Sequence, residues 1–438
     1  MTNWQEDYDK KLVTAEEAVK VVKSGDMVAF AMGREAFSLG LALAARKEEL
    51  KDVSLFLAFP GRDFGWYDPG WEDSFKIELG YVMPVSHNMM AERRCEFSCS
   101  DLFYRQSWYA KEIDVLLVEV APPNQHGFCC FGASLWHKKS QVKMSNIVLA
   151  EVNKNTIRTY GDNYIHVSEI DYLVEHTPTG HLPGTTDMVG RKTREPSALE
   201  RSIAEYVSTL VKDGDTIEIG AGGTAEFIPH LGAFNQRKDL GIHTEICPSG
   251  MIELVQKGIV TGKCKNIHPG KIVCTAVGGQ KKHLDYVNEN PLFEFYGADY
   301  MLDPRVIAAN DNMVAINTAI AIDLTGQIAA ETVGHRPVGS TGGQLAYATG
   351  ANLSRGGRSI VVLPSTAKNG TVSRITVSFE PGTVVSVPRT LADYIVTEYG
   401  IASLRGKPQR ERAMELISVA HPDFRADMKK EVEKLFYP

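Results

Sequence analysis

The stretch DGDTIEIGAGGTAEFIPHL at residues 213–231, followed by RKDLGIHTEICPSG at residues 237–250, decides our expectation for the fold. The short, apolar-alternating run Thr216–Ile219 predicts a β-strand. The glycines of Gly220–Gly223 predict a turn after this strand, and Ala225–Leu231 predicts a helix after the turn. The order strand, glycine turn, helix is typical of an open α/β sheet.

A second strand begins within Lys238–Ile242, and Pro248 and Gly250 stop it just past Glu245. In an open α/β sheet, ligands bind at the carboxyl ends of the strands and in the adjacent loops. A glycine-rich turn that leads into a helix also offers backbone N–H groups to an anion. We therefore expect Glu245 and the glycine turn to face one crevice, which is the candidate active site.

The composition is that of an ordinary globular enzyme. The chain has 438 residues, 43% of them hydrophobic and 23% charged, and this length favours two or three domains. The net charge of −7 without a Lys/Arg block favours neither nucleic acid nor a membrane surface as partner. The polar N-terminus argues against a secretory signal, and seven cysteines without a CxxC pair predict reduced thiols in the cytoplasm. The chain has no run of about 18 apolar residues, so we expect no transmembrane helix.

The chain also repeats itself. Three pairs of segments are similar: 24–36 and 213–225, 51–61 and 238–250, and Asn124–Gly127 and Asp323–Gly326. The offset is 189 in the first pair and 199 in the last. This repeat predicts two copies of one α/β unit, which we place in domains 1–190 and 191–438, with the Pro-, Gly- and Thr-rich stretch 175–197 as the linker.

The repeat is asymmetric at the candidate active site. Where the second copy has Thr244–Glu245, the first has Leu57–Ala58. A residue that the fold needs should occur in both copies, whereas a residue that chemistry needs has to occur in only one. This asymmetry favours a functional Glu245 over a surface salt bridge. For Cys247 we favour a small buried residue beside the turn over a nucleophile.

An aromatic cluster stands in the first copy, at Phe64, Trp66, Tyr67 and Trp71. Two interpretations stay open: these rings pack over the edge of a sheet, or they form the apolar wall of a pocket for a bulky substrate. The twelve histidines have no ligand spacing, so we expect no metal site.

One interpretation of the glycine turn is a dinucleotide site. The run Gly220-Ala221-Gly222-Gly223-Thr224-Ala225 fits G-x-G-x-x-A after a strand, and Glu245 follows at the distance of a ribose-binding acid. Against this interpretation stand a second glycine turn at Gly342–Gly343 and the lack of a substrate domain with its own acid/base pair.

Many further stretches match one known family in order. They include SGDMVAF, PPNQHGFCCFGAS, GDNYIHVSEIDYLVE, IEIGAGGTAEFI, LGIHTEICPSG, AINTAIAIDLTGQI, GSTGGQ, SRGGRSIVVLPSTAKNG and DYIVTEYGIASLRGK. With them the chain resembles the acetyl-CoA hydrolase/transferase family of class I CoA-transferases, above all the 4-hydroxybutyrate and butyrate:acetate CoA-transferases. The resemblance implies two similar open α/β domains of the class I CoA-transferase type, an active site at their interface, and a homodimer or higher homo-oligomer.

The same resemblance assigns roles to residues. Glu245 would be the acyl-accepting glutamate of a ping-pong reaction, and the turn at Gly342 and Gly343 would supply one oxyanion donor. A second donor is expected near Ala58–Phe59. Coenzyme A, a substrate rather than a permanently bound cofactor, would be held by seven residues: Gly220, Ala221, Gly222, Gly223, Thr224, Gln344 and Lys368.

Three departures from the family pattern bear on the acid. Leu302 stands where short-chain members usually have Asn, Leu345–Tyr347 replaces the usual x-Asp-Phe, and Gly33–Glu35 lacks the usual Pro. We therefore expect a bulky apolar acid, aromatic or alicyclic, with succinyl-CoA or acetyl-CoA as donor. The alternatives are a short-chain CoA-transferase, an acyl-CoA hydrolase and, in a different class, an NAD(P)-dependent oxidoreductase.

Overall fold

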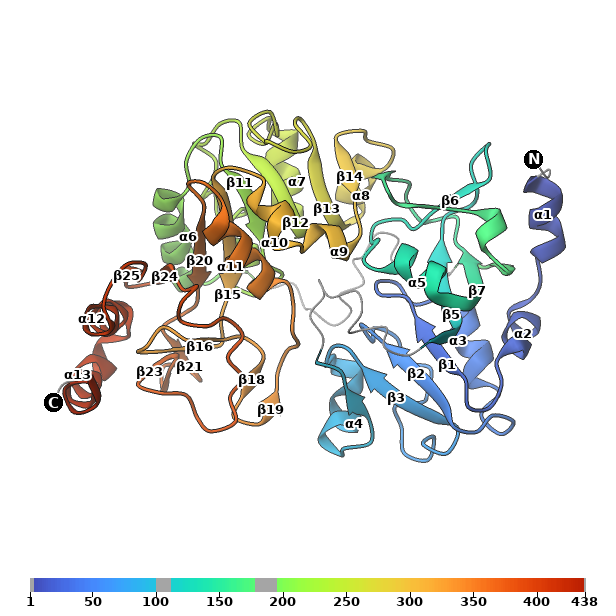
Figure 1. Cartoon of the computed structure of the whole chain (residues 1–438), viewed down its shortest axis with the longest axis horizontal. Coiled ribbons are helices and arrows are strands. Elements are labelled where there is room, and N and C mark those ends of the chain that lie inside the picture. Colours follow the sequence, from blue (N-terminus) through green and yellow to red (C-terminus); the bar gives the residue numbers. More distant parts are fainter. Residues whose placement is uncertain (1–3, 100–111, 178–194, 437–438) are drawn as a thin grey trace. The chain divides into compact units, whose positions relative to one another are not determined.

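The structure is a computed structural model, and it describes residues 4–99, 112–177 and 195–436. Its internal contacts divide the chain into two compact units, residues 1–192 with 275–300 and residues 193–274 with 301–438. Most of the stretch in which we expected the linker, residues 178–194, lies outside the described residues. Both units combine helices with largely parallel sheets, which confirms the predicted α/β class (Figure 1).

Within its described residues, the first unit is built on a seven-stranded sheet of order β10-β7-β5-β1-β2-β3-β4. The strands are β1 (Met27–Phe30), β2 (Val53–Leu57), β3 (Phe75–Leu79), β4 (Glu96–Phe97), β5 (Ile113–Val120), β7 (Ser145–Val152) and β10 (Tyr172–Glu175). Every neighbouring pair is parallel. Because helices cover both faces of a parallel sheet, its strands are apolar along most of their length.

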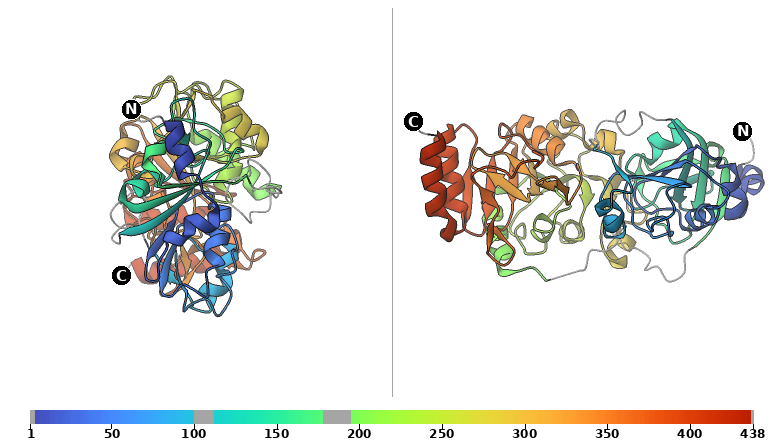
Figure 2. Two further views of the ribbon diagram at one scale, coloured as in Figure 1. Left: turned by 90° about the vertical axis from the view of Figure 1, so that its right-hand side faces the viewer. Right: turned by 90° about the horizontal axis from the view of Figure 1, so that it is seen from below.

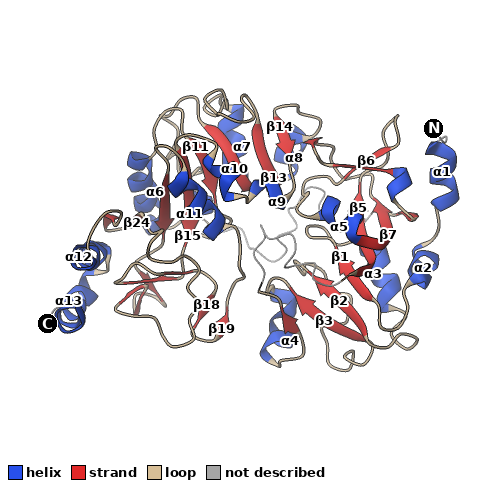
Figure 3. Cartoon of the chain, in the orientation of Figure 1, coloured by secondary structure: helices blue, strands red, loops and turns tan. Residues whose placement is uncertain are grey.

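The chain leaves the centre of this sheet in two directions, from β1 towards β3 and from β5 towards β10. Right-handed crossovers in opposite directions place their helices on opposite faces (Figure 3). The helices of the unit are α1 (Trp4–Lys11), α2 (Ala15–Ala18), α3 (Phe37–Ala44), α4 (His87–Ala91), α5 (Lys138–Met144) and α8 (Lys281–Val287). Two strand pairs complete it, β6 (Phe128–Cys130) with β9 (Tyr164–His166), and β8 (Tyr160–Gly161) with β14 (Phe293–Phe295).

The second unit repeats this plan, with a run of strands in the order β25-β24-β20-β15-β11-β12. They are β11 (Thr216–Ile219), β12 (Gly241–Cys247), β15 (Met313–Thr318), β20 (Arg358–Val362), β24 (Tyr394–Thr397) and β25 (Gly400–Ser403). Strand β11 has neighbours β12 and β15, as β1 has neighbours β2 and β5. The bounds of β1 and β11 differ by the offset of 189 that the sequence repeat gave. Both β13 (Ile272–Val277) and α9 (Ala298–Met301) cross a boundary between the units.

The turns of the repeat also match atom by atom. Oδ1 of Asn124 accepts hydrogen bonds from the amides of the residues two and four positions later, His126 and Phe128. Oδ1 of Asp323 accepts the same two bonds, from the amides of Thr325 and Gln327. Side chains of Asn and Asp stabilise turns in this way, so the repeat extends to local backbone geometry.

Helices and small sheets complete the second unit. Its helices are α6 (Ala198–Leu210), α7 (Ser249–Gln256), α10 (Pro304–Ala308), α11 (Gln344–Leu353), α12 (Gln409–Val419) and α13 (Pro422–Phe436). Its short strands are β16 (Ala321–Asp323), β17 (Ile328–Ala329), β18 (Thr332–Val333), β19 (Arg336–Pro337), β21 (Thr366–Ala367), β22 (Val372–Ser373) and β23 (Ile375–Thr376). The last two helices, α12 and α13, pack side by side over an apolar cluster that includes Leu416 and Val432 (Figure 2). No helix of the described residues combines the length and the apolar character that crossing a membrane requires.

The aromatic cluster of the first unit belongs to its core. Phe64, Trp66 and Tyr67 are buried, and the Trp66 ring lies 4.7 Å from the Phe64 ring and 5.5 Å from the Phe30 ring, centroid to centroid. This confirms the packing interpretation for these three residues. Their rings pack against one another and against Phe30 of β1, so their contacts give no indication of a pocket wall.

Candidate active site

Glu245 lies near the carboxyl end of β12, beside the place where the strand order of the second unit reverses. From β11 the chain proceeds to β12 on one side, and from β15 to β20 and β24 on the other. The carboxyl ends of β11 and β15 flank this switch point, the position at which open α/β sheets bind ligands. The loop Gly220–Thr224 follows β11, and Asn317 and Thr318 end β15. The predicted glutamate and glycine turn thus lie at one edge of one sheet.

The carboxylate of Glu245 is in direct contact with the second glycine turn. The amide of Gly343 donates a hydrogen bond to Oε2 of Glu245, with a nitrogen–oxygen distance of 3.1 Å. A Cβ atom at position 343 would lie 2.3 Å from Oε2 of Glu245 and 2.4 Å from Cδ2 of Leu302. Only glycine therefore allows the backbone to approach the carboxylate this closely.

Glu331 holds the loop that leads to Gly343. Its carbonyl oxygen accepts the amides of Val338 and Gly339 at 2.9 and 3.1 Å, and its carboxylate accepts the Thr341 hydroxyl at 2.7 Å. Directly after the turn, Gln344 begins α11, and its Nε2 is a buried donor without a partner among the described residues. Fixed on both sides, the turn presents the Gly343 amide in a defined direction.

The environment of Glu245 changes its acidity. The side chain is half-buried, and desolvation raises its pKa from 4.5 to about 7, although the Gly343 amide favours the ionised form. At neutral pH this carboxyl group is therefore close to its titration midpoint. Such a group can act as a nucleophile when ionised and is easily neutralised.

The helix expected over Ala225–Leu231 is wrong. The structure has a three-residue 3-10 helix, Ala225–Phe227, followed by turns. Pro229 has no N–H to bond the Ala225 carbonyl, and Gly232 adopts a φ of +81° that ends the segment. The expected helix N-terminus for a phosphate is therefore absent at this position, which also removes the support for a dinucleotide site.

The glycine turn itself is tightly packed on one side and open on the other. A Cβ atom at Gly220 would lie 2.2 Å from Oδ1 of Asn317, and one at Gly222 would lie 2.6 Å from Oγ1 of Thr318. A Cβ at Gly223 would meet no atom within 4 Å. Within the described parts of the chain, the amides of Gly223 and Thr224 donate no hydrogen bond. The turn retains two backbone donors for an anion.

The structure keeps Lys368 apart from these contacts. It lies exposed at the tip of the hairpin of β21 and β22, and in the described chain its ammonium group makes no hydrogen bond or ion pair. Cys247 is fully buried, and burial raises the pKa of its thiol to about 12, which confirms the small buried residue that we favoured. Among the described residues, no three or more His, Cys, Asp or Glu side chains gather as a metal site.

Sequence reasoning missed three buried polar side chains beneath Glu245. Glu218 on β11 and Asn317 on β15 are hydrogen-bonded, with Nδ2 of Asn317 donating to Oε2 of Glu218 at 2.8 Å. His243 on β12 has Nε2 3.3 Å from the carbonyl oxygen of Met301, and burial lowers its pKa to about 3, so its ring is neutral. The signal available in the sequence was a charged residue in the middle of the apolar strand Thr216–Ile219.

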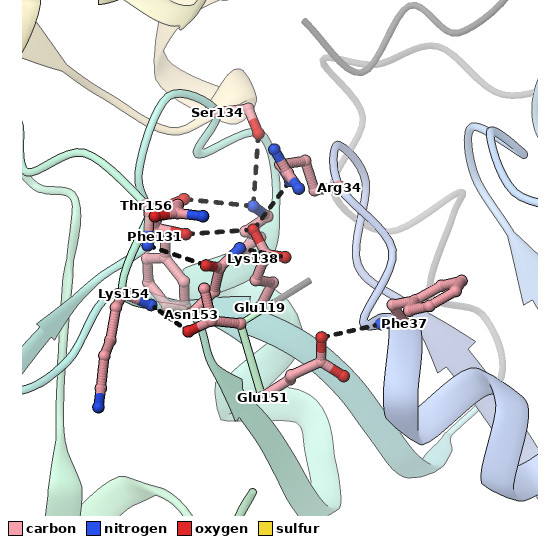
Figure 4. A network of polar contacts seen from close by, with 12 residues as sticks. Arg34, Phe37, Glu119, Phe131, Ser134, Lys138, Glu151, Asn153, Lys154 and Thr156 are labelled. Atoms are coloured by element: carbon pink, nitrogen blue, oxygen red, sulfur yellow. Dashed lines mark hydrogen bonds and ion pairs between the residues drawn. The ribbon is translucent and has the colours of Figure 1, made fainter. Parts of the chain in front are cut away.

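The equivalent edge of the first unit is occupied by its own side chains (Figure 4). Glu151 accepts hydrogen bonds from the amides of Phe37 and Ser38, at 3.0 and 2.7 Å, and so caps α3. Glu119 forms an ion pair with Arg34 at 3.0 Å and accepts from Nδ2 of Asn153 at 3.1 Å. Both carboxylates serve the fold, whereas Glu245 of the second unit bonds only one amide among the described residues.

Comparisons with known proteins identify the family of the chain. Residues 1–179 match the acetyl-CoA hydrolase/transferase N-terminal domain, and residues 279–432 match the C-terminal domain of the same family. The chain is 37% identical to the 4-hydroxybutyrate coenzyme A transferase of Clostridium kluyveri, over 99% of this chain and 100% of the relative. It is 34% identical to the succinyl-CoA:cyclohexane-1-carboxylate CoA transferase of Geobacter metallireducens, over 99% of this chain and 97% of the relative.

Solved structures are similar over the same length. RipA from Yersinia pestis superimposes with a TM-score of 0.91 at 31% identity, covering 99% of this chain and all of that one. The 4-hydroxybutyrate CoA-transferase from Porphyromonas gingivalis superimposes with a TM-score of 0.80 at 34% identity, with the same coverage. Both family domains match, and full-length relatives exceed 30% identity. The chain therefore belongs to the acetyl-CoA hydrolase/transferase family.

Proposed function

We propose that this protein is a CoA-transferase that moves coenzyme A from an acyl-CoA to a carboxylic acid, with Glu245 as the acyl acceptor. One observation carries the proposal: a half-buried carboxylate at a strand end lies 3.1 Å from a glycine amide that points at one of its oxygens. A CoA-transferase has to conserve the free energy of the thioester while it exchanges the acid. A carboxylate nucleophile does this because its acyl derivative, a mixed anhydride, is at least as reactive as a thioester.

The proposed reaction has two halves. The ionised Glu245 attacks the thioester carbonyl, and the carbon–sulfur bond breaks to give a mixed anhydride and CoA thiolate. The thiolate then attacks the glutamyl carbonyl, which releases the first acid as its carboxylate and leaves a glutamyl–CoA thioester. A second carboxylate reverses both steps and leaves as the new acyl-CoA, so the kinetics are ping-pong.

The Gly343 amide suits the second attack. When the thiolate adds to the glutamyl carbonyl, negative charge develops on a glutamyl oxygen, and the amide is already 3.1 Å from Oε2. Donors at about 2.7–3.1 Å from a developing oxyanion are the geometric requirement for this stabilisation. Gly342 belongs to the same turn. We keep the second donor near Ala58–Phe59 as part of the proposal.

Binding of CoA is proposed for the two glycine turns. The amides of Gly223 and Thr224 and the Nε2 of Gln344 are donors without partners among the described residues. They suit the phosphates and amides of CoA. Lys368 would contribute a cation from its exposed hairpin. A hydrolase of the same family would use the same contacts but would release the acyl group to water.

We propose a bulky apolar acid, aromatic or alicyclic, with succinyl-CoA or acetyl-CoA as donor. A Cβ atom at Gly343 would lie 2.4 Å from Cδ2 of Leu302 and 3.3 Å from the ring of Tyr347. Apolar groups therefore border the Gly343 turn and the Glu245 carboxylate that it contacts. The relatives include both short-chain enzymes and one enzyme named for cyclohexane-1-carboxylate. Phe64, Trp66 and Tyr67 no longer support this choice because they are in the core of the first unit. A homodimer, expected from the family resemblance, is tested by light scattering.

The deciding experiment is the intact mass of the protein after incubation with succinyl-CoA or acetyl-CoA, followed by borohydride trapping and peptide mapping. We expect a CoA adduct in the intact mass, which an acceptor carboxylate discharges. Borohydride should release the CoA and leave the reduced alcohol of Glu245 on the peptide that contains this residue. Glu245→Ala should lose the adduct. Glu433→Ala, which removes an exposed carboxylate, should retain it. An adduct-free protein that binds NAD(P) would overturn the proposal.

A further inference from the structure

A second carboxyl group lies beneath Glu245 and takes no part in the reaction described above. Glu218 is the third residue of β11, and only 1% of its surface is exposed. Strand β11 lies between β12 and β15, so both of its edges are hydrogen-bonded in the sheet. A carboxyl group in such a position is costly unless it is paired or neutral. Among the described residues, no Lys or Arg forms an ion pair with Glu218.

The strand register places Glu218 on the same face as Glu245. Ile217 of β11 is opposite Ile242 of β12, and side chains alternate between the faces along a strand. Glu218 therefore shares its face with His243 and Glu245. The ring of Tyr347, from α11, packs against His243 on this face, at 6.4 Å between ring centroids.

Glu218 is linked to the glycine turn at Gly220 through the side chain of Asn317. Nδ2 of Asn317 donates to Oε2 of Glu218 at 2.8 Å, and this bond fixes the orientation of the amide. Oδ1 of the same amide then packs against Gly220, at the position where a Cβ atom would lie only 2.2 Å away. Glu218, on the same face of the sheet as Glu245, is thus linked through Asn317 to the Gly220 turn that we propose for CoA.

The fold does not require a carboxyl group at this position. In the first unit, β1 has the same place in its sheet as β11, and its third residue is Ala29. The extra carboxyl group occurs only in the unit that carries Glu245. The same asymmetry distinguishes Glu245 itself from Ala58.

In the described parts of the chain, the groups that face Glu218 include no cation paired with it. On β12 these are Glu245 and the neutral His243, and on α11 it is Tyr347, whose hydroxyl burial keeps protonated by raising its pKa. Nζ of Lys265 bonds the carbonyls of Ile242 and Lys271.

The acidity of Glu218 follows from these surroundings. Burial and then the charge of Glu245 raise the pKa of Glu218 well above its usual value, against the hydrogen bond from Asn317. A charge on the half-buried Glu245 therefore disfavours ionisation of the buried Glu218.

We propose that Glu218 is a positioning residue that works as a neutral carboxylic acid: it holds Asn317 against the Gly220 turn and keeps a second negative charge away from Glu245. This inference rests on the proposed function, because each half-reaction places negative charge on a glutamyl oxygen. An ionised Glu218 would oppose that charge, whereas a protonated one does not. Glutamine reproduces the shape, the neutrality and the acceptor oxygen of this group, and leucine reproduces only its bulk.

Two measurements on the full chain test the proposal. The first is the infrared difference spectrum between wild type and Glu218→Gln at about pH 8, where the ordinary pKa of a glutamate would leave it ionised. We expect a protonated carboxyl band in wild type that the variant lacks. The second is steady-state transfer, in which Glu218→Leu should lose about 10²-fold in kcat with KM changed less than about threefold. Glu218→Gln should recover most of this loss.

The control is Glu200→Gln, which alters another buried carboxyl group of the same unit, the helix cap of α6. It should leave kcat unchanged. The proposal is overturned if wild type has no protonated band, or if Glu218→Leu transfers CoA as fast as Glu218→Gln. Should the leucine variant fail to fold, the infrared band and the kcat of Glu218→Gln decide. Wild type that forms no CoA adduct would contradict the proposed function instead, independently of Glu218.

Discussion

The amide of Gly343 and Oε2 of Glu245 lie 3.1 Å apart, although the two residues are separated by 98 positions in the chain. The carboxylate comes from the end of β12, and the amide comes from a turn held by Glu331. The contact joins the proposed nucleophile to the amide that would stabilise negative charge on its acyl derivative. The two groups can come this close because residue 343 is a glycine, which has no Cβ atom.

Gly343→Ala tests this dependence. The added Cβ would lie 2.3 Å from Oε2 of Glu245 and 2.4 Å from Cδ2 of Leu302, closer than real Cβ contacts, so the turn has to move away. Because loss of one oxyanion donor costs about 10²–10³ in rate, we expect kcat for CoA transfer to fall by that factor. Circular dichroism should show a folded protein.

Gly339→Ala is the matched control in the same loop. The closest atom to its new Cβ would be the Ala330 carbonyl oxygen at 3.3 Å, so a shift of a few tenths of an ångström accommodates it. Equal activity of the two alanine variants would contradict a role for the Gly343 amide.

The rate of CoA transfer should depend on pH through Glu245. Desolvation raises its pKa to about 7, and only the ionised form attacks a thioester. We expect kcat/KM to rise about tenfold per pH unit below about pH 7 and to level off above it. The measurement is a profile of initial rates at low acyl-CoA concentration. A plateau that extends down to about pH 5 would show that Glu245 is not the titrating nucleophile.

The same group links stability to pH. The pKa of Glu245 is 4.5 unfolded and about 7 folded, so the folded state disfavours the charge. Below about pH 4.5 both states are protonated and there is no cost, and stability is lost as the pH rises from there through about 7. Glu245→Gln should therefore raise the free energy of unfolding at pH 8, by up to about 3 kcal/mol, and by less at pH 5. Urea unfolding at the two pH values measures the difference.

The elements that local patterns control were predictable from the sequence. The alternation in Thr216–Ile219 and the glycines after it predicted β11 and its turn, and the repeat predicted a second sheet of the same plan. Glu245 could be chosen because its counterpart, Ala58, is apolar. The helix over Ala225–Leu231 was wrong because a single proline and a left-handed glycine outweigh helical periodicity.

Contacts between distant segments were not predictable in this way. The hydrogen bond from Asn317 to Glu218 joins residues 99 positions apart, and it exists because β11 and β15 are neighbours in the sheet. Nothing local in either strand indicates the partner. The side-chain direction of Trp66 has the same origin: a tryptophan in a loop can face solvent, a ligand or a core, and only the fold decides.

Trp66 should therefore matter for stability and not for the choice of acid. Its side chain is fully buried against Phe30 and Phe75 in the first unit. Removal of such a ring costs about 3–5 kcal/mol, so we expect Trp66→Ala to lower the melting temperature clearly. At a temperature where the variant is folded, its ratio of kcat/KM for cyclohexane carboxylate over butyrate should equal that of wild type. A changed ratio would restore the pocket interpretation of the aromatic cluster.

Leu302 is the residue through which we expect the acid to be chosen. Its Cδ2 lies 2.4 Å and Oε2 of Glu245 lies 2.3 Å from the position that a Cβ at Gly343 would take, so Leu302 borders the carboxylate proposed to accept the acyl group. An apolar contact here favours an alicyclic or aromatic acid, whereas an amide would leave polar atoms against the ring and offer a partner to a hydroxyl group. Leu302→Asn should lower the ratio of kcat/KM for cyclohexane carboxylate over 4-hydroxybutyrate by about 10–100-fold, the usual effect of one or two apolar groups in a pocket.

Leu302→Met, which keeps the side chain apolar, is the control and should leave the ratio within about threefold. If wild type already prefers butyrate over bulky acids by a large factor, the apolar acid is the wrong substrate class. The family assignment would stand unchanged.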